Sequence, residues 1–354
     1  MTMARVLWGG PAPADIGRPA SRAVETWVAQ YGLKRPLLVT QGDSRGPADP
    51  LVHQLEAAGI SVQPFDRAHD AHVAVIADAV AQYHFEGCDG LIAVGGWTPV
   101  MVAKAAALMV GQRAPLSALS ETLGNDRSPI DPTTIPPLAA VADTLDAAAA
   151  VGGFIHILDE ATAPVLLRHC GLRPRLLILD PWRIGGVAAE QQAEAAATLV
   201  LRAIDALSIG IWPVDLTPAL TAVLDDPDPW DSVAALASLL EERVGPAWIL
   251  AASVAAYAGL SVTGLFAALM PTAAHIAVLD PELRDRVAVA ASRVPLHGPL
   301  PVPLLDTPSL RALTAVAYDG APIDLRPLLS ALDLAMPHGP TRGGGRRGRR
   351  RDVA

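Results

Sequence analysis

The chain has 354 residues, of which 51% are hydrophobic and 18% are charged, so it is long enough for two domains and is not a disordered chain. Its formal net charge of −9 argues against a general nucleic-acid-binding protein. Aromatic residues make up only 4%, so we expect a core built from Ala, Val, Leu and Ile.

The first part of the chain alternates short apolar runs with segments of helical periodicity. We expect strands at 37–40, 60–65 and 90–96, and helices at 49–58, 72–87 and 100–110. Gly59 and Gly87 stand where helix C-termini favour glycine. This repeated strand–helix order is typical of a parallel sheet that is covered on both faces.

The second part of the chain changes character after Pro181. A loop is expected over 112–137 and strands over 137–142, 154–158 and 175–181, whereas every segment from about 188 to 335 has helical periodicity. The predicted fold is therefore a Rossmann-like α/β domain followed by an all-helical domain. We place the Rossmann-like nucleotide-binding-type domain at 1–185, the helical domain at 186–336 and a disordered Arg-rich tail at 337–354.

The two cysteines and the chain ends bear on the compartment. Cys88 and Cys170 form no Cys-x-x-Cys pair, which excludes a zinc ribbon and a thiol redox motif and indicates a reducing cytosol. Neither a signal peptide nor an uncharged apolar stretch is apparent, so we expect a cytoplasmic protein without a membrane segment. The tail carries six arginines against one aspartate, and it is the one part expected to contact nucleic acid, if any does.

The best-placed candidate for a binding site is the strand–turn–helix DGLIAVGGWTPVMVAKAAAL. Gly95 and Gly96 would let the backbone approach a pyrophosphate, and Thr98 opens a helix whose N-terminus offers free N–H groups. The pattern is neither G-x-G-x-x-G nor a Walker loop, so an ordinary strand-to-helix turn is the alternative.

These segments resemble the iron-containing alcohol dehydrogenase family, within the dehydroquinate synthase-like fold. The resemblance runs from GLKRPLLVTQGD, which ends at Asp43, through LEAAGISVQPFDRAHDAHVAVIADAVAQYHFEGCDGLIAVGGWTPVMVAKAAAL, and returns at RLLILDP. It implies a nucleotide-binding N-terminal domain, a helical C-terminal domain and NAD(P) as cofactor. It adds Asp43, Lys104 and Thr144 to Gly95, Gly96 and Thr98 as cofactor-binding candidates.

The chain departs from the family pattern at the turn and at the metal site. Trp97 stands where the family has a third glycine, and Met101 stands where it has a helical aspartate. The family binds its divalent ion with one Asp and three His. Those positions fall on Thr198, Arg202, Ala256 and, loosely, Thr272, with His275 three residues further on. Because such a site needs about three protein ligands, we predict no catalytic metal.

Arg202 is the candidate for stabilising negative charge on a carbonyl oxygen, because a guanidinium stays charged at neutral pH. Tyr257 or His275 would supply the proton. The alternative is that Arg202 pairs with Asp205 or with an acid on another helix. His69 and His72 could share one helical face, but a solvent-exposed turn and helix cap is favoured for them.

The leading hypothesis is a metal-independent NAD(P)-linked oxidoreductase that acts on a small alcohol, aldehyde or keto acid in the cleft between the domains. The maleylacetate reductase branch of the same superfamily also works without a metal. The alternatives are a repurposed or non-catalytic relative that binds another ligand or a protein partner, and a cofactor-free lyase or cyclase. Relatives with this fold often form dimers, so a homodimer is left open.

Overall fold

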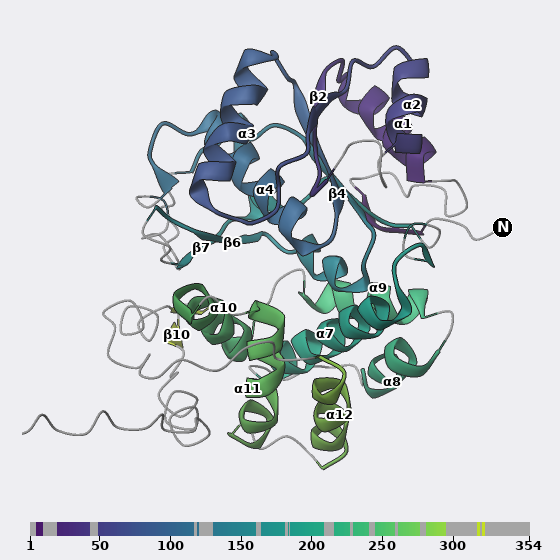
Figure 1. The fold of residues 1–354 in the computed structure, drawn as a ribbon, viewed down its shortest axis with the longest axis vertical. Coiled ribbons are helices and arrows are strands. Elements are labelled where there is room, and N and C mark those ends of the chain that lie inside the picture. Colours follow the sequence, from purple (N-terminus) through teal and green to yellow (C-terminus); the bar gives the residue numbers. More distant parts are fainter. Residues whose placement is uncertain are drawn as a thin grey trace, which may run out of the picture.

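The computed structural model describes residues 5–9, 20–42, 49–116, 119, 130–160, 164–180, 183, 185–208, 216–226, 229–240, 245–258, 261–276, 281–294, 317–318 and 321–322. Two layers of structure are evident: a sheet flanked by helices, and a helical domain beneath it (Figure 1). The predicted tail at 337–354 lies outside the described residues.

A six-stranded sheet forms the centre of the N-terminal domain. Its strands are ordered β1 (Arg5–Gly9), β8 (Leu176–Leu179), β5 (Leu138–Ala142), β4 (Gly90–Gly95), β2 (Pro36–Val39) and β3 (Gln63–Phe65). All neighbours pair in parallel except β1, which runs antiparallel to β8. The prediction of a parallel sheet is therefore confirmed for five strands. The antiparallel edge strand β1 was not predicted.

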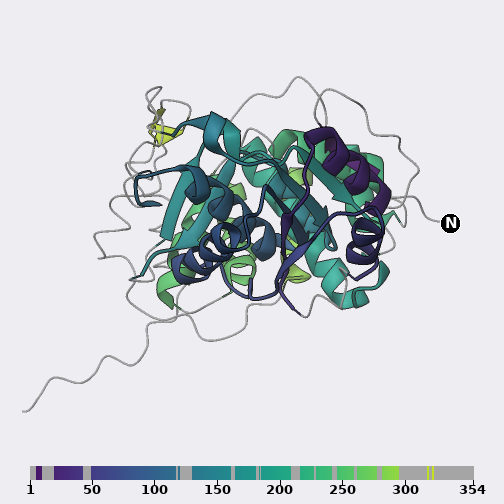
Figure 2. The ribbon, with the colours of Figure 1, turned by 90° about the horizontal axis from the view of Figure 1, so that it is seen from above.

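Helices cover both faces of this sheet, as the continuous apolar strands require. On β4, Ile92 and Val94 face a core that includes α1 (Ala20–Tyr31) and α2 (Asp49–Ala57). Leu91 and Ala93 face the opposite core, which includes α3 (Val73–Phe85) and α4 (Trp97–Gly111). The view from above shows these helices on the two sides of the strands (Figure 2).

The helix ends follow the sequence signals. Gly59 and Gly87 have φ values of 80° and 62°, in the left-handed region that favours glycine at a helix C-terminus. His72 precedes α3, and its Nδ1 accepts a hydrogen bond of 3.1 Å from the backbone N–H of Ala74. The favoured interpretation of His72 as a helix cap is thereby confirmed.

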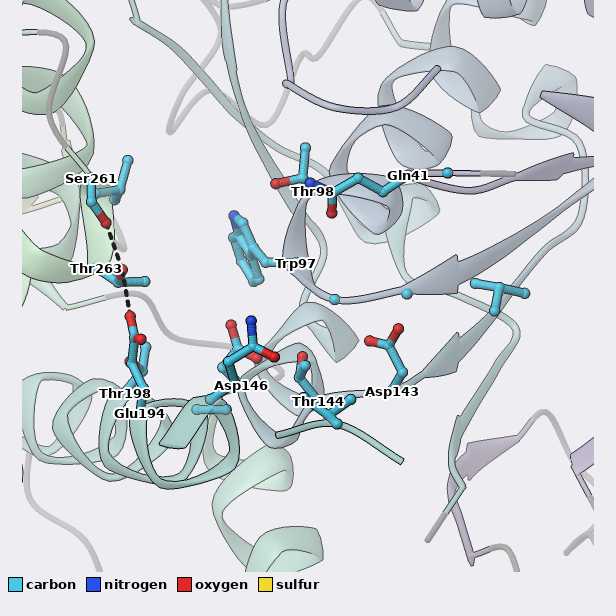
Figure 3. Close-up of a pocket in the computed structure, with 18 of the residues that line it drawn as sticks. Gln41, Trp97, Thr98, Asp143, Thr144, Asp146, Glu194, Thr198, Ser261 and Thr263 are labelled. Atoms are coloured by element: carbon cyan, nitrogen blue, oxygen red, sulfur yellow. Dashed lines mark hydrogen bonds between the residues drawn. The ribbon is translucent and has the colours of Figure 1, made fainter. Parts of the chain in front are cut away.

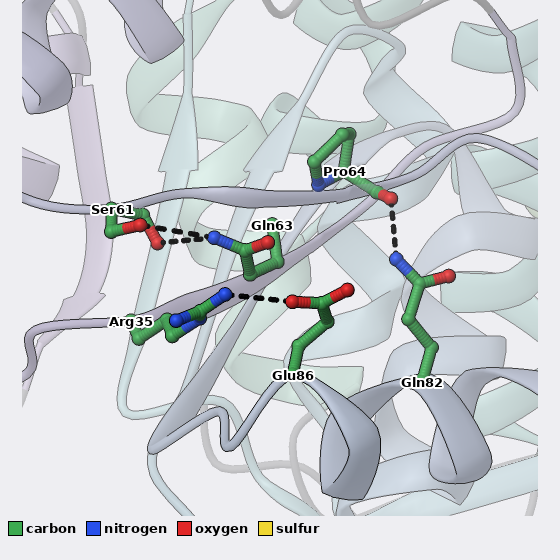
Figure 4. Close-up of polar contacts among 6 residues, drawn as sticks. All are labelled: Arg35, Ser61, Gln63, Pro64, Gln82 and Glu86. Carbon is green, nitrogen blue, oxygen red and sulfur yellow. Dashed lines mark hydrogen bonds and ion pairs between the residues drawn. The ribbon is translucent and has the colours of Figure 1, made fainter.

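Polar side chains fasten α3 to the edge of the sheet (Figure 4). Gln82 donates a hydrogen bond of 2.8 Å to the Pro64 carbonyl on β3, and Arg35 forms an ion pair of 2.7 Å with Glu86. Both contacts lie on the side of the domain away from the cavity described below.

The strand expected at 154–158 exists but lies outside the main sheet. It is β6 (Phe154–Leu158), which pairs antiparallel with β7 (Pro164–Arg168) in a separate two-stranded sheet. Three short 3₁₀ segments complete this part of the chain: η1 (Pro132–Thr134), η2 (Leu145–Val151) and η3 (Cys170–Leu172).

The C-terminal domain is helical, as its periodicity predicts. Its helices are α7 (Ala189–Leu207), α8 (Thr217–Asp225), α9 (Trp230–Leu240), α10 (Pro246–Ala258), α11 (Val262–Ile276) and α12 (Pro281–Ser292). Among the described residues, no helix has the length and apolar character needed to cross a membrane.

The prediction of helix is wrong for one part of the C-terminal region. β9 (Ala317–Tyr318) and β10 (Ala321–Pro322) form a short antiparallel pair where a helical segment was predicted. The two residues between them in the sequence are Asp-Gly, a pair that favours a tight hairpin turn and opposes a helix.

Candidate functional site

A cavity of about 800 Å³ lies between the two domains, at the carboxyl ends of β2, β4 and β5. β2 and β4 are neighbours, but the chain leaves β2 for β3 on one side and continues from β4 to β5 on the other. Such switch points are where open parallel sheets bind ligands. The residues lining the cavity are Thr40, Gln41, Gly42, Val94, Gly95, Gly96, Trp97, Thr98, Asp143, Thr144, Asp146, Val187, Gln191, Glu194, Ala195, Thr198, Trp248, Ser261, Val262 and Thr263.

The glycine turn after β4 forms one wall of the cavity. Gly95 has φ 136°, and a Cβ there would lie 2.9 Å from Cγ of Pro99, so only glycine fits without a shift. Gly96 is the N-cap of α4, and no side chain caps this helix end by a hydrogen bond. The first N–H groups of α4 are therefore not taken by a capping side chain, which suits an anionic ligand.

Trp97 is the first residue of α4, and its indole reaches across toward the helical domain (Figure 3). Its ring centroid lies 5.6 Å from that of Phe154 and 5.6 Å from that of Trp248. The Trp248 ring is nearly perpendicular to it and packs in turn on Phe266, at 5.0 Å. An aromatic cluster thus joins the two domains at the inner end of the cavity.

Arg202 lies inside this aromatic cluster and does not line the cavity. Arg202 is only 2% exposed, and its Cζ lies 4.1 Å from the ring centroids of both Trp97 and Trp248. Burial lowers the pKa of the guanidinium to about 9, against the opposing effect of Asp146 and Asp205. The group therefore stays protonated at neutral pH and holds the two indoles by cation–π contacts.

The alternative of an Arg202–Asp205 pair is only partly realised. The two groups interact electrostatically, but the Asp205 carboxylate accepts hydrogen bonds from the backbone N–H groups of Ala247 (3.1 Å) and Trp248 (2.8 Å). Asp205 on α7 thus caps the beginning of α10, which helps to fix Trp248.

Two acidic side chains line the cavity after β5. Burial and the neighbouring charge of Asp146 raise the pKa of Asp143 to about 6, and Oδ1 of Asp143 has no hydrogen-bond partner among the described residues. Burial also raises the pKa of Asp146. Sequence reasoning gave these two residues no functional role, although their place directly after a buried strand at the switch point was a usable signal.

The helical domain supplies the opposite wall. Ser261 and Thr263, at the beginning of α11, share a hydrogen bond of 2.8 Å, and the Thr263 hydroxyl donates to Oε1 of Glu194 on α7 at 3.5 Å. These hydroxyl and carboxyl groups lie across the cavity from Trp97 and Thr98, at the beginning of α4 (Figure 3).

The structure brings together four of the six predicted cofactor-binding residues: Gly95, Gly96, Thr98 and Thr144. It places Lys104 elsewhere, because this fully buried side chain donates hydrogen bonds to the carbonyls of Gly152 (2.5 Å) and Phe154 (3.4 Å). Burial, together with the charges of Arg202 and Arg173, holds the pKa of Lys104 well below its usual range. Asp43 lies outside the described residues.

The other two predicted catalytic residues lie on helices that contribute to the cavity. Tyr257 is on α10, which also carries Trp248, and His275 is on α11, which begins beside Ser261. Their side chains fall outside the described part of the structure, so their roles stay predictions.

Two of the positions where the resemblance places metal ligands have described side chains on α7. Thr198 lines the cavity with a nearly buried hydroxyl, and Arg202 one turn further along α7 presents a cation. Within the described ranges, no group of three or more His, Cys, Asp or Glu residues is arranged to hold a metal ion.

Comparison with known proteins finds similarity to the family that the sequence resembles. Residues 13–181 match the iron-containing alcohol dehydrogenase family. The chain is also similar to choline dehydrogenase from Bacillus subtilis, with 29% identity over 164 residues (44% of this chain and 39% of the relative). It is similar to 4-hydroxybutyrate dehydrogenase from Cupriavidus necator, with 29% identity over 180 residues (50% and 46%). The resemblance seen in the sequence is confirmed, and the matches span less than half the length of these relatives.

Solved structures extend the family's fold over the helical domain. Maleylacetate reductase from Agrobacterium tumefaciens superposes with a TM-score of 0.62 at 19% identity, over 90% of this chain and 93% of the other. A 1,3-propanediol oxidoreductase gives a TM-score of 0.62 at 20% identity, over 77% and 82%. The Rossmann-like domain and the following helical domain are therefore arranged as in the iron-containing alcohol dehydrogenase fold.

Proposed function

We propose that the chain is a metal-independent NAD(P)-linked oxidoreductase that acts on a small alcohol, aldehyde or keto acid in the interdomain cavity. The observation that carries this proposal is the glycine turn at Gly95 and Gly96, followed by the uncapped N-terminus of α4, at the switch point of the sheet. The cavity of about 800 Å³ falls in the size range of cofactor sites.

The residues present fit a nicotinamide nucleotide. Backbone N–H groups at the beginning of α4 would hold its pyrophosphate, and the hydroxyls of Thr98 and Thr144 stand beside the same turn. Asp43 remains a candidate from the resemblance, whereas Lys104 is engaged with backbone carbonyls in the core. When bound, the nicotinamide supplies the acceptor or donor of a hydride.

Metal independence is part of the proposal because the fixed cation of Arg202 replaces a ligand. A divalent ion beside Thr198 would lie close to the buried Arg202 guanidinium, and this repulsion is strong where water is excluded. The carboxylates that line the cavity are not grouped to hold an ion among the described residues. The residues therefore argue against a metal in the iron position, and no step of the reaction is assigned to one.

We assign the proton of the reaction to Asp143. A group whose pKa lies near the working pH is suited to accept the hydroxyl proton of an alcohol and to return it to a carbonyl oxygen. Asp143 meets this condition, with a pKa of about 6; the residue lines the cavity, and its buried Oδ1 has no partner among the described residues. Tyr257 and His275 remain the alternatives from sequence.

Titration of the purified full chain with NADH and with NADPH tests the proposal, followed by reduction assays on a panel of neutral aldehydes and keto acids. We expect saturable binding of one of the two nucleotides and turnover of at least one carbonyl class. Lack of binding at millimolar concentration of both nucleotides would contradict the proposal.

A second candidate is a relative that has lost the cofactor and binds a neutral or cationic ligand. Among the described residues that line the cavity, the ionisable side chains are Asp143, Asp146 and Glu194, and none is Lys, Arg or His. Carboxylates beside the glycine turn oppose a pyrophosphate when they are ionised. An amine or polyol that binds while both nucleotides fail would favour this candidate.

A further inference from the structure

We infer that Arg202 is a positioning residue that holds the indole of Trp97 away from the glycine turn and thereby keeps the turn open to an anionic ligand. This inference rests on the proposed function, and it assigns Arg202 a role that differs from contact with a substrate oxygen. A large side chain directly after Gly96 would otherwise stand at the entrance to the anion-binding end of α4.

The first step of the argument is the position of the indole. Trp97 is the first residue of α4, so its side chain has the choice of lying over the helix N-terminus or folding toward the helical domain. The structure shows the second arrangement, with ring contacts to Phe154 and Trp248 at centroid distances of 5.6 Å each.

The second step is what stabilises that arrangement. The Arg202 guanidinium covers Trp97 and Trp248 at 4.1 Å each and lies 5.6 Å from the ring of Phe154. Desolvated cation–π contacts of this kind are among the stronger ones. Because Arg202 comes from α7 and Trp248 from α10, the helical domain fixes a residue that belongs to the nucleotide-binding turn of the other domain.

The third step is that, beside the charges of Asp146 and Asp205, the contacts of Arg202 are with aromatic rings. It is 2% exposed and does not line the cavity, and its Nη2 atom has no hydrogen-bond partner among the described residues. Asp205, its nearest acidic neighbour on α7, is engaged with the backbone of α10. The guanidinium thus contacts the indoles, and apart from the charge of Asp146 these rings connect it to the cavity.

A double-mutant cycle separates this role from direct contact with a ligand, with NADH affinity as the measurement. We expect Arg202→Met to weaken NADH binding about tenfold or more, because the released indole covers the turn. Trp97→Gly alone should change affinity less than about threefold. The double variant should regain affinity to within about threefold of the wild type, since no indole remains to obstruct the turn.

If Arg202 contacted the ligand itself, the double variant would bind as poorly as Arg202→Met, and this result would overturn the inference. Arg202→Lys keeps the charge but cannot cover two rings, so it should fall between the wild type and Arg202→Met. This variant also carries the test if Arg202→Met does not fold. Arg35→Met, which breaks the ion pair with Glu86 on the far side of the domain, is the matched control and should bind as the wild type does.

A measurement without ligand tests the role of Arg202 separately from nucleotide binding. The Trp97–Trp248 pair, with rings 79° apart, should give an exciton couplet in circular dichroism. The couplet should be lost in Trp97→Phe and reduced in Arg202→Met, but retained in Arg35→Met. Failure of the wild type to bind both NADH and NADPH would overturn the proposed function, whereas an unchanged couplet in Arg202→Met would overturn the inference about Arg202.

Discussion

At the scale of single residues, Asp143 combines two effects that have opposite consequences. Its carboxyl group stands beside Gly96, with Oδ1 3.9 Å from the place a Cβ would take there, so its ionisation opposes a pyrophosphate at the turn. Arg183 partly offsets this charge and Asp146 adds to it. The same carboxylate is the proposed acceptor of the alcohol proton.

Asp143→Asn should therefore bind NADH about three- to tenfold more tightly at pH 7.5 while its kcat for alcohol oxidation falls about a hundredfold or more. In the wild type, binding should strengthen as the pH falls through about 6, because Asp143 takes up a proton there. Fluorescence titration and steady-state kinetics at pH 5.5 and 7.5 check both effects. Equal losses of affinity and turnover in the variant would contradict this assignment.

His156 makes a second residue-scale prediction. Burial, and to a smaller extent the charge of Arg202, lowers its pKa to about 4, so the folded protein keeps it neutral while the unfolded chain protonates it below about 6.5. The unfolded state then binds more protons, and His156 makes the fold less stable as the pH falls from about 6.5 to about 4.

Between pH 7 and pH 5, the wild type should lose about 2 kcal/mol more unfolding free energy than His156→Leu. Urea unfolding of both proteins at the two pH values measures this difference. The buried aspartates also make the unfolding free energy depend on pH, but they are present in both proteins, so their effect cancels in the comparison. An equal pH dependence in the two proteins would show that folding does not lower the pKa of His156, and would contradict the prediction.

At the scale of elements, the beginning of α10 depends on a side chain from α7. Asp205 accepts hydrogen bonds from the N–H groups of Ala247 and Trp248, and a Cβ at Gly245 would overlap its carboxylate. Glycine at 245 is thus required by the close approach of two helices. Because Trp248 follows directly, this contact also orders the aromatic wall of the cavity.

Asp205→Ala should lower the unfolding free energy by about 3 kcal/mol, because two buried N–H groups lose their acceptor. Asp205→Asn, which keeps an acceptor oxygen, should cost about 1 kcal/mol. The matched control is Asp78→Ala, which breaks an exposed ion pair with Arg67 and should change stability by less than about 0.5 kcal/mol. Chemical denaturation gives all three values, and equal effects of Asp205→Ala and Asp78→Ala would contradict the capping role.

The elements of the N-terminal domain were largely predictable because local signals and tertiary structure agree there. The buried run at 90–96 and the helix that stops at Gly87 needed no tertiary information. The hairpin partner β7 and the antiparallel edge strand β1 were missed. β1 pairs with β8 from the far end of the domain sequence, so only the assembled sheet reveals it. β7 follows β6 after a short connection, and the sequence analysis overlooked this local pairing.

The candidate site was only half predictable for a related reason. Gly95, Gly96, Thr98 and Thr144 lie together as the spacing and the resemblance implied. In contrast, the stacking of Arg202 between Trp97 and Trp248 joins three elements that nothing in the sequence connects. The engagement of Lys104 with the carbonyls of Gly152 and Phe154 depends in the same way on packing that no local pattern encodes.

At the scale of the whole molecule, the iron-containing alcohol dehydrogenase fold extends over both domains. The match to the family covers residues 13–181, and the helical domain follows the same fold at low identity. A guanidinium held by two indoles now occupies the region where the resemblance places a metal ligand. The proposed metal independence rests on this replacement.

The most direct test is the activity of the full chain after exhaustive treatment with EDTA, measured as NADH- or NADPH-dependent reduction of a small carbonyl compound. The account predicts that turnover is unchanged within twofold by EDTA and is not increased by added iron(II) or zinc(II), while Gly96→Val abolishes nucleotide binding. Activity that disappears with EDTA and returns with one of these metals would contradict it.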